Sequence, residues 1–281
     1  MAAECLLLFS FHQSIQIQAM TLVRPCLTAL LLATLSSASF ALQPLITDDT
    51  GTQGEGNKQI EVGLVDERAS LSGESTRTRT LPLVFTWGAT ETLDLYVGVT
   101  PTMIRSDAPG ADADGLGNTA LGAKWRFMDN ADSGTSLAVK TEVRLPVSSG
   151  QEASGLGTGL TSYGLTLILS QDVSFGSLHF NLARGRDEFR ADSLIPQADS
   201  LRTSFAPIWN VSDEWKLALE VGREAVSSAG ESTSTQFVQL GAIYSPSEDL
   251  DFAFGILQSN DSATPQTTTT TATAGLTWRF K

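Results

Sequence analysis

Apolar and polar residues alternate with a period of two along most of the chain. In the hairpin over residues 117–146, for example, Leu121 and Trp125 alternate with Lys124 and Arg126. Because successive side chains on a strand point to opposite faces, this pattern predicts strands with one apolar and one polar face. The apolar face could meet either the core of a soluble sandwich or membrane lipid, and one hairpin fits both.

About twelve segments share this alternation, and each has about the 9–11 residues that a tilted strand needs to cross a bilayer. They are Lys58–Arg68, Arg77–Trp87, Leu93–Ile104, Gly117–Phe127, Thr135–Pro146, Gly159–Asp172, Ser177–Arg186, Ser200–Trp209, Glu214–Arg223, Thr235–Ser245, Leu250–Ser259 and Thr270–Phe280. The pattern therefore predicts an all-β chain.

The connections between these segments alternate strictly between two kinds. Short ones are Gly88–Thr92, Met128–Gly134, Val173–Gly176, Asn210–Asp213 and Pro246–Asp249. Longer, polar ones are Ala69–Thr76, Arg105–Leu116, Val147–Thr158, Asp187–Asp199, Glu224–Ser234 and Asn260–Thr269. Tight periplasmic turns and longer outer loops are typical of outer-membrane barrels, whereas a soluble sandwich has no reason to separate its loops in this way. We predict a transmembrane antiparallel up-and-down β-barrel of about 12 strands.

Aromatic residues lie beside the short turns, where they would form the periplasmic half of an aromatic girdle. In a sandwich the same residues would belong to the core. They are Trp87, Trp125, Phe127, Trp209, Trp215 and Phe252.

The first 41 residues have the features of a targeting segment. Arg24 precedes an apolar run that is too short for a transmembrane helix, and small residues end at Ala41. We expect a signal peptide that starts at Met20 and is cleaved after Ala41. A lead-in segment or loop over residues 42–57 and a barrel over 58–281 would follow. Both cysteines, Cys5 and Cys26, lie in the removed part, so the mature chain has no disulfide.

Composition agrees with a membrane barrel and excludes one class of partner. Charged residues make up 17% of the chain, below the roughly 25% of soluble proteins. The formal net charge is −13, so phosphate backbones would repel the chain and we expect no nucleic-acid binding.

The last strand is amphipathic and nearly ends in an aromatic residue, with Leu276, Trp278 and Phe280 on one face. Such an end resembles the signal that the outer-membrane assembly machinery recognises, although the aromatic residue is here the penultimate one. Pairing of this strand with Lys58–Arg68 would close the barrel and remove its edges.

Several stretches resemble one family of outer-membrane barrels, that of the MetA pathway of phenol degradation. They are Leu45–Gly54, Gly115–Asn118 leading into Leu121–Phe127, Lys140–Pro146, Gly155–Gly164 and Leu178–Leu182. The resemblance covers most of the mature chain. It implies a barrel in the bacterial, Gram-negative outer membrane and a link to the uptake of hydrophobic or aromatic compounds, and it brings no catalytic residues.

The candidate lumen residues are mostly charged. They are Lys124, Arg126, Lys140, Glu142 and Arg144 on neighbouring strands, with His179 and Asn181 on another. The charges could select solutes in an open lumen, or they could form a structural network that fills a narrow barrel. About twelve strands fall between filled barrels of about 8 strands and open porins of 16–18.

Catalytic and metal chemistry find little support. His179 is the one histidine of the expected mature chain, and no nucleophile motif accompanies it. Asp48-Asp49 and Asp112–Asp114 resemble parts of calcium loops but lack the further carboxylates of an EF-hand. We expect no cofactor, no metal and no enzyme, although divalent cations could bridge the loop at Asp112 to lipopolysaccharide.

Two functions from different classes remain open. The first is a passive channel for small molecules, with apolar or aromatic ones as candidates. The second is a non-conducting barrel with a structural, surface-binding or assembly role. A barrel enzyme built on His179 is a third and weaker hypothesis. Expected partners are outer-membrane lipid and lipopolysaccharide, the assembly machinery and a small solute.

Overall fold

The computed structural model describes residues 44–190 and 196–281. The expected signal peptide, with its start at Met20 and its cleavage after Ala41, lies outside the described residues. No helix in the described part of the chain is long and apolar enough to cross a membrane.

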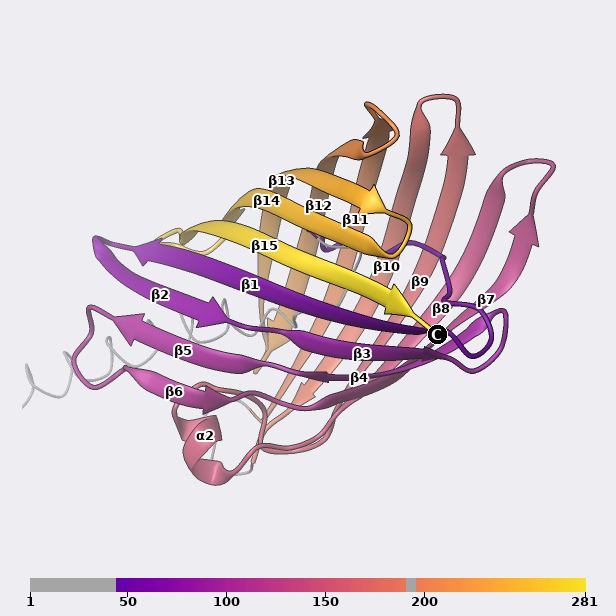
Figure 1. Ribbon diagram of the computed structural model, residues 1–281. Coiled ribbons are helices and arrows are strands. Elements are labelled where there is room, and N and C mark those ends of the chain that lie inside the picture. The colour runs from indigo at the N-terminus through magenta and orange to yellow at the C-terminus, as the bar shows by residue number, and fades with distance from the viewer. Residues whose placement is uncertain (1–43, 191–195) are drawn as a thin grey trace, which may run out of the picture. The chain divides into compact units, whose positions relative to one another are not determined.

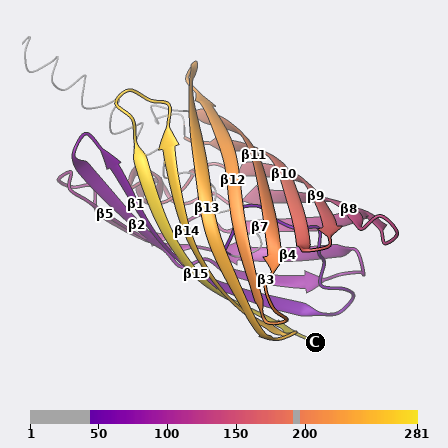
Figure 2. The ribbon, with the colours of Figure 1, turned by 90° about the horizontal axis from the view of Figure 1, so that it is seen from above.

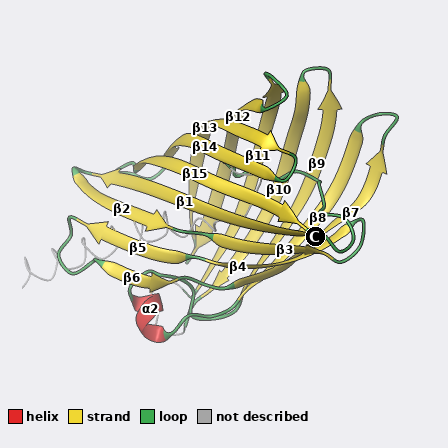
Figure 3. Cartoon of the chain, in the orientation of Figure 1, coloured by secondary structure: helices red, strands yellow, loops and turns green. Residues whose placement is uncertain are grey.

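The described chain forms one antiparallel sheet of fifteen strand segments, with one short helix outside it (Figures 1 and 3). The elements are β1 (Lys58–Leu71), β2 (Glu74–Thr80), β3 (Leu83–Gly88), β4 (Leu93–Val99), β5 (Pro101–Ser106), β6 (Ala113–Leu116), β7 (Ala120–Asn130), β8 (Thr135–Arg144), α2 (Ser149–Ala153), β9 (Ser162–Val173), β10 (Gly176–Glu188), β11 (Gln197–Asn210), β12 (Trp215–Ser228), β13 (Glu231–Ser247), β14 (Leu250–Asp261) and β15 (Thr268–Phe280).

Three barrel strands are each divided into two segments, so the fifteen segments make a twelve-stranded barrel, as predicted. β2 and β3 are one strand interrupted at Leu81–Pro82, and both pair with β1. Pro82 has no N–H to donate to the ladder, and its carbonyl instead accepts a hydrogen bond from Gly63 N at 2.8 Å. The pairs β4–β5 and β6–β7 are interrupted in the same way, at Thr100 and at residues 117–119.

The last strand closes the barrel against the first one. β15 pairs with β1 from Lys58↔Phe280 to Ser70↔Thr268. The view from above shows the strands wrapped around a common interior (Figure 2). Closure leaves the full-length strands without a free edge. A membrane-spanning sheet must be closed in this way, because the bilayer core offers no hydrogen-bond partners for an open edge.

The outer face of the sheet is apolar. On β9, Leu165, Leu167 and Leu169 point outward and are 46%, 48% and 38% exposed, whereas Ile168 and Ser170 point inward and are buried. This alternation repeats around the barrel, so apolar side chains cover its outside. Soluble monomers rarely expose contiguous apolar patches above a few hundred Å². The apolar face therefore meets lipid, and the soluble sandwich is excluded.

Aromatic residues form a band at the end with the short turns, which we call the periplasmic end. Trp215 stacks on Tyr244 at 4.8 Å between ring centroids, and Tyr244 stacks on Phe252 at 6.5 Å. Phe175–Trp209 and Trp278–Phe280 form two further stacked pairs. The band extends the predicted girdle to residues that the sequence analysis did not assign to it.

Two of the six predicted outer loops are wrong. Residues 69–76 and 224–234 are continuous hairpins whose turns contain only Ser72-Gly73 and Ala229-Gly230. All four residues have positive φ, from 51° to 93°. This is the two-residue turn whose twist matches that of paired strands. The polar residues predicted to form loops therefore belong to strands that extend beyond the bilayer. The barrel strand predicted to start at Gly117 begins earlier, at Ala113, and is interrupted at residues 117–119 before β7. The helix α2 was not predicted.

Candidate functional site in the barrel lumen

The chain before β1 runs inside the barrel, which the prediction of a lead-in or loop missed. We call residues 44–57 the lumen segment. Its start lies against β13, where Gln239 Nε2 donates to the Pro44 carbonyl at 2.6 Å. Its end lies beside β4, where Gln53 N donates to Asp94 at 3.0 Å. The segment therefore crosses the lumen from one wall to another.

Glu220 on β12 anchors the first part of the lumen segment. Its carboxylate is fully buried and accepts from Ile46 N at 2.8 Å and from Thr47 N at 2.7 Å. The Thr47 hydroxyl lies 2.6 Å from the same carboxylate and 2.6 Å from Ser204 Oγ. Beside it, Leu45 packs in a small apolar cluster with Ala206, Ile208 and Ala218. Three donors from one segment therefore bind the Glu220 carboxylate. They hold this part of the segment firmly, because hydrogen bonds to charged groups are stronger than those between neutral groups.

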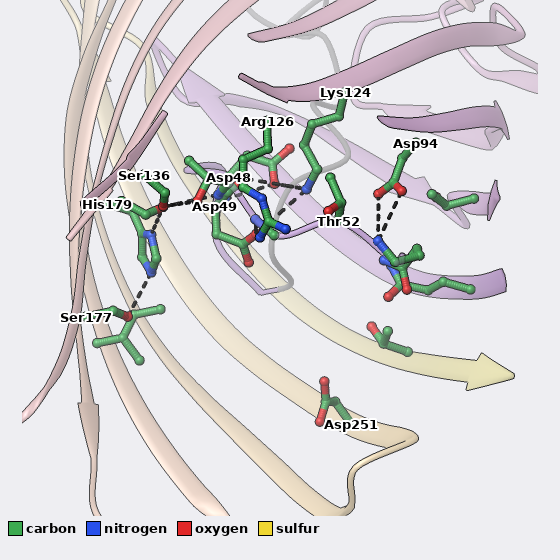
Figure 4. Close-up of a pocket in the computed structure, with 18 of the residues that line it drawn as sticks. Asp48, Asp49, Thr52, Asp94, Lys124, Arg126, Ser136, Ser177, His179 and Asp251 are labelled. Atoms are coloured by element: carbon green, nitrogen blue, oxygen red, sulfur yellow. Dashed lines mark hydrogen bonds and ion pairs between the residues drawn. The ribbon is translucent and has the colours of Figure 1, made fainter. Parts of the chain in front are cut away.

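Asp48 joins the lumen segment to two lysines, Lys124 on β7 and Lys140 on β8. Figure 4 shows Asp48 beside Lys124. Its carboxylate lies 2.7 Å from Lys140 Nζ and 3.5 Å from Lys124 Nζ. The Asn181 amide, oriented to satisfy its neighbours, donates to the Asp48 carbonyl at 3.0 Å and accepts from the Asp48 N–H at 2.6 Å. Asn181 thus pairs with the Asp48 backbone as a neighbouring strand would.

The following residues continue along β7, β8 and β9. Asp49 lies 3.7 Å from Lys124 Nζ. Thr50 N donates to Ser170 Oγ at 3.1 Å, and the Thr50 and Ser136 hydroxyls are 2.5 Å apart. The lumen segment is therefore held by side chains from eight strand segments, namely β13, β12, β11, β10, β9, β8, β7 and β4.

His179 lies between two serine hydroxyls, 2.8 Å from Ser170 Oγ at Nδ1 and 2.8 Å from Ser177 Oγ at Nε2. A hydrolase triad needs a carboxylate on one ring nitrogen, to orient the imidazole toward a nucleophile on the other. Both nitrogens here meet hydroxyls, which fits a hydrogen-bonded wall residue.

A second network lies nearer the outer end, on β4, β8 and β10. The Tyr96 hydroxyl donates to Glu142 at 3.2 Å, and Arg144 lies 2.9 Å from Asp187 and 3.6 Å from Glu142. Gly122 faces Tyr96 so closely that a Cβ there would overlap the ring and the Thr141 carbonyl. A glycine is needed at this position to make room for the aromatic side chain.

A cavity of about 690 Å³ lies between the lumen segment and the periplasmic end. Four of the seven predicted lumen residues line it, namely Lys124, Arg126, Lys140 and His179. Asn181 instead holds the Asp48 backbone, and Glu142 and Arg144 belong to the second network. The lining also contains charged residues that the sequence analysis missed, namely Asp48, Asp49, Glu61, Asp94, Asp129, Asp172, Lys216, Asp251 and Arg279.

Metal ligands are not gathered in this part of the molecule. Within residues 44–190 and 196–281, no group of three or more His, Cys, Asp and Glu side chains could hold a metal ion. Asp48, Asp49, Asp94 and Glu220 meet lysine or backbone N–H groups instead.

Comparison with known proteins identifies the family. The family model described as "Putative MetA-pathway of phenol degradation" matches residues 43–280. The chain belongs to this family. The match covers the whole barrel and the lumen segment, so the resemblance seen in the sequence is confirmed.

Solved structures share the fold at low sequence identity. An outer-membrane channel from Pseudomonas putida F1 is 14% identical with a TM-score of 0.62, over 83% of this chain and 98% of that one. The β domain of the Bordetella autotransporter BrkA is 11% identical with a TM-score of 0.51, over 80% and 100%. A comparison with curated proteins gave no match. The predicted transmembrane barrel is confirmed, and its place is the bacterial outer membrane.

Proposed function

We propose that this protein is a passive channel through which small molecules cross the outer membrane. The observation that carries the proposal is a closed barrel containing a polar cavity of about 690 Å³ next to its periplasmic end. A cavity of this size suits a small solute, since ligand pockets commonly measure about 300–1,000 Å³.

The lumen charges divide into two groups by burial and position. Lys140, Lys124 and Arg144 are held in largely buried ion pairs with carboxylates, so we assign them to the structural network that keeps the lumen segment and barrel wall in place. Arg126, which is paired at 3.5 Å with the exposed Asp129, and Lys216 line the cavity nearer the periplasmic end, and we assign solute contact to them.

Small aromatic or apolar molecules are the first solutes to test. The family description names phenol degradation, and the Pseudomonas putida F1 relative is described as a channel. A phenol fits the cavity by size.

We infer a transport role rather than an enzymatic one, because His179 is bonded to two serines instead of a carboxylate–nucleophile pair. We also propose export by the signal peptide ending at Ala41 in a Gram-negative cell. The outer-membrane assembly machinery would then recognise the strand that carries Leu276, Trp278 and Phe280.

The test is conductance in planar bilayers with full-length protein purified from outer membranes. We expect discrete, salt-dependent steps. Lys216→Glu should shift the reversal potential in a salt gradient toward cation selectivity, because it reverses a charge in the cavity wall. Glu231→Lys, at the start of β13 next to the outer turn, is the control and should shift the reversal potential much less.

The alternative is a non-conducting barrel with a structural or surface-binding role. The lumen segment favours it, because its contacts reach eight strand segments and occupy the interior. A folded barrel that is silent in bilayers and does not accelerate uptake of phenol into proteoliposomes would support this alternative against the channel.

A further inference from the structure

Three arginines form a row across neighbouring strands on the outside of the barrel. Arg68 on β1 is directly opposite Arg77 on β2, and Arg77 is directly opposite Arg105 on β5. Their chain neighbours Ala69, Thr76 and Ile104 are buried, so the arginines point away from the lumen. We call Arg68, Arg77 and Arg105 the arginine row. β1, β2 and β5 lie side by side in Figure 1.

Like charges directly opposite on paired strands are unfavourable without counterions. Asp66 bridges Arg77 and Arg79, and Asp114 binds Arg105 at 2.9 Å. Asp112 lies 4.0 Å from Arg105. Arg68 has no ion pair within residues 44–190 and 196–281, and each guanidinium has five N–H donors. Asp107 interacts with Arg68 only beyond ion-pair distance. Because the described carboxylates do not use all the guanidinium donors of the four arginines, donors are left for a further anion.

The row lies at the upper boundary of the apolar belt. On the same outward face, Leu64, Leu81, Met103 and Leu116 are 52%, 41%, 39% and 41% exposed. Arg68 is four residues beyond Leu64, or about 13 Å along the strand at 3.3 Å per residue. The tight turn at Ser72-Gly73 follows on the outer side. The guanidinium groups are thus at headgroup depth in the outer leaflet, above a surface that fits acyl chains.

We propose that the arginine row binds the phosphate groups of lipopolysaccharide, with the acyl chains on the apolar surface below. Lipopolysaccharide is the outer-leaflet lipid that combines several phosphates with many acyl chains on one headgroup. Arginine suits this ligand because its planar fork matches phosphate oxygens with two parallel hydrogen bonds. Register spacing between neighbouring strands, about 5 Å, gives one phosphate access to two guanidinium groups at once.

The test is lipid binding by native mass spectrometry, with full-length protein in detergent titrated with deep-rough lipopolysaccharide or phosphatidylglycerol. Arg68→Gln is the key variant, because it removes a charge without breaking an ion pair of the described chain. We expect it to weaken lipopolysaccharide binding about fivefold to tenfold, since a basic residue at a membrane surface contributes about 1 kcal/mol. Arg68→Gln/Arg105→Gln should weaken it further.

Arg223→Gln is the matched control, because Arg223 is an exposed arginine of β12 that donates to Ser234 Oγ at 2.6 Å. It should bind lipopolysaccharide as the unmodified protein does. The proposal is overturned if Arg68→Gln behaves like this control. It is also overturned if the unmodified protein binds phosphatidylglycerol as tightly as lipopolysaccharide, since that result indicates general attraction to anionic lipid. Heat-shifted mobility on gels checks that each variant is folded.

Discussion

Replacement of Asp48 by asparagine should release the lumen segment without unfolding the barrel. Asp48 contacts Lys140 at 2.7 Å and Lys124 at 3.5 Å, and its side chain is 7% exposed. Removing one partner of a buried ion pair costs about 3–5 kcal/mol. The cost here is at or somewhat below the lower end of this range, because Lys140 and Lys124 also line the cavity, where water can solvate them, and Lys124 keeps Asp49.

We therefore expect Asp48→Asn to destabilise the docked lumen segment by about 2–3 kcal/mol. At 1.4 kcal/mol per factor of ten, the equilibrium between docked and released segment shifts roughly 30- to 150-fold. Docking of the segment is destabilised and the barrel is not, because the hydrogen bonds that close the barrel do not involve Asp48.

Hydrogen exchange measured by mass spectrometry distinguishes release of the lumen segment from unfolding of the barrel. The peptide covering residues 44–57 should exchange roughly 30- to 150-fold faster in Asp48→Asn, while peptides from β9 to β12 keep their protection. Asp132→Asn, in an exposed periplasmic turn, is the control and should change neither. Unchanged exchange in residues 44–57, or equal acceleration of segment and strands, would refute the reasoning.

Three further changes test other parts of the fold. Gly122→Ala should destabilise the barrel by about 1–3 kcal/mol through overpacking against Tyr96, measured as a lower transition temperature. Lowering the pH through and below about 4.5 should loosen the outer connection that contains α2. Burial acts to raise the pKa of Glu152, but hydrogen bonds from Arg190 and Gly159 outweigh it and hold the pKa below the ordinary 4.5. A carboxylate whose pKa is lower in the folded protein than in the unfolded chain stabilises the folded state at pH values above its unfolded pKa. This stabilisation is lost as the pH falls through the folded-state pKa, so a spin label at Gly150 should become more mobile at low pH. Deleting residues 276–281 removes five of the thirteen register pairs of β1 with β15 and should abolish the heat-shifted folded band.

Each of these predictions has a matched control. Gly164→Ala should be tolerated, because a Cβ there meets only the Glu142 Cβ at 3.5 Å. Glu152→Gln should give a mobile label at every pH, and a profile that still changes with pH would show that another group controls the connection. Deleting only Lys281, which lies outside the β1 register, should leave the folded band intact.

The barrel could be predicted from the sequence because lipid imposes a simple rule on it. Each strand needs an apolar residue at every second position, and Leu165, Leu167 and Leu169 satisfy this rule whatever their neighbours are. Turn length was harder to predict. Polar stretches around Ser72 and Ala229 resemble loops, although they continue the strands into water, where alternation no longer requires apolar residues.

The lumen segment could not be found by the same rule. Residues 44–57 have no periodicity, because they pair with side chains of many strands rather than with one neighbouring backbone (Figure 4). Tertiary contacts such as Asn181 with the Asp48 backbone depend on closure of the barrel, which brings residues more than 130 positions apart into contact. Local sequence patterns carry no record of such a pairing.

Charge balance was the signal that could have revealed it. The hairpin of β7 and β8 carries Lys124, Arg126, Lys140 and Arg144 on its polar face against the carboxylates Asp129 and Glu142. An excess of two positive charges in a low-dielectric lumen needs counterions, because buried charges are costly unless paired. The Asp48-Asp49 pair, considered above as a fragment of a calcium loop, supplies them. In a barrel with an unbalanced polar face, an acidic stretch before the first strand is therefore a candidate for insertion into the lumen.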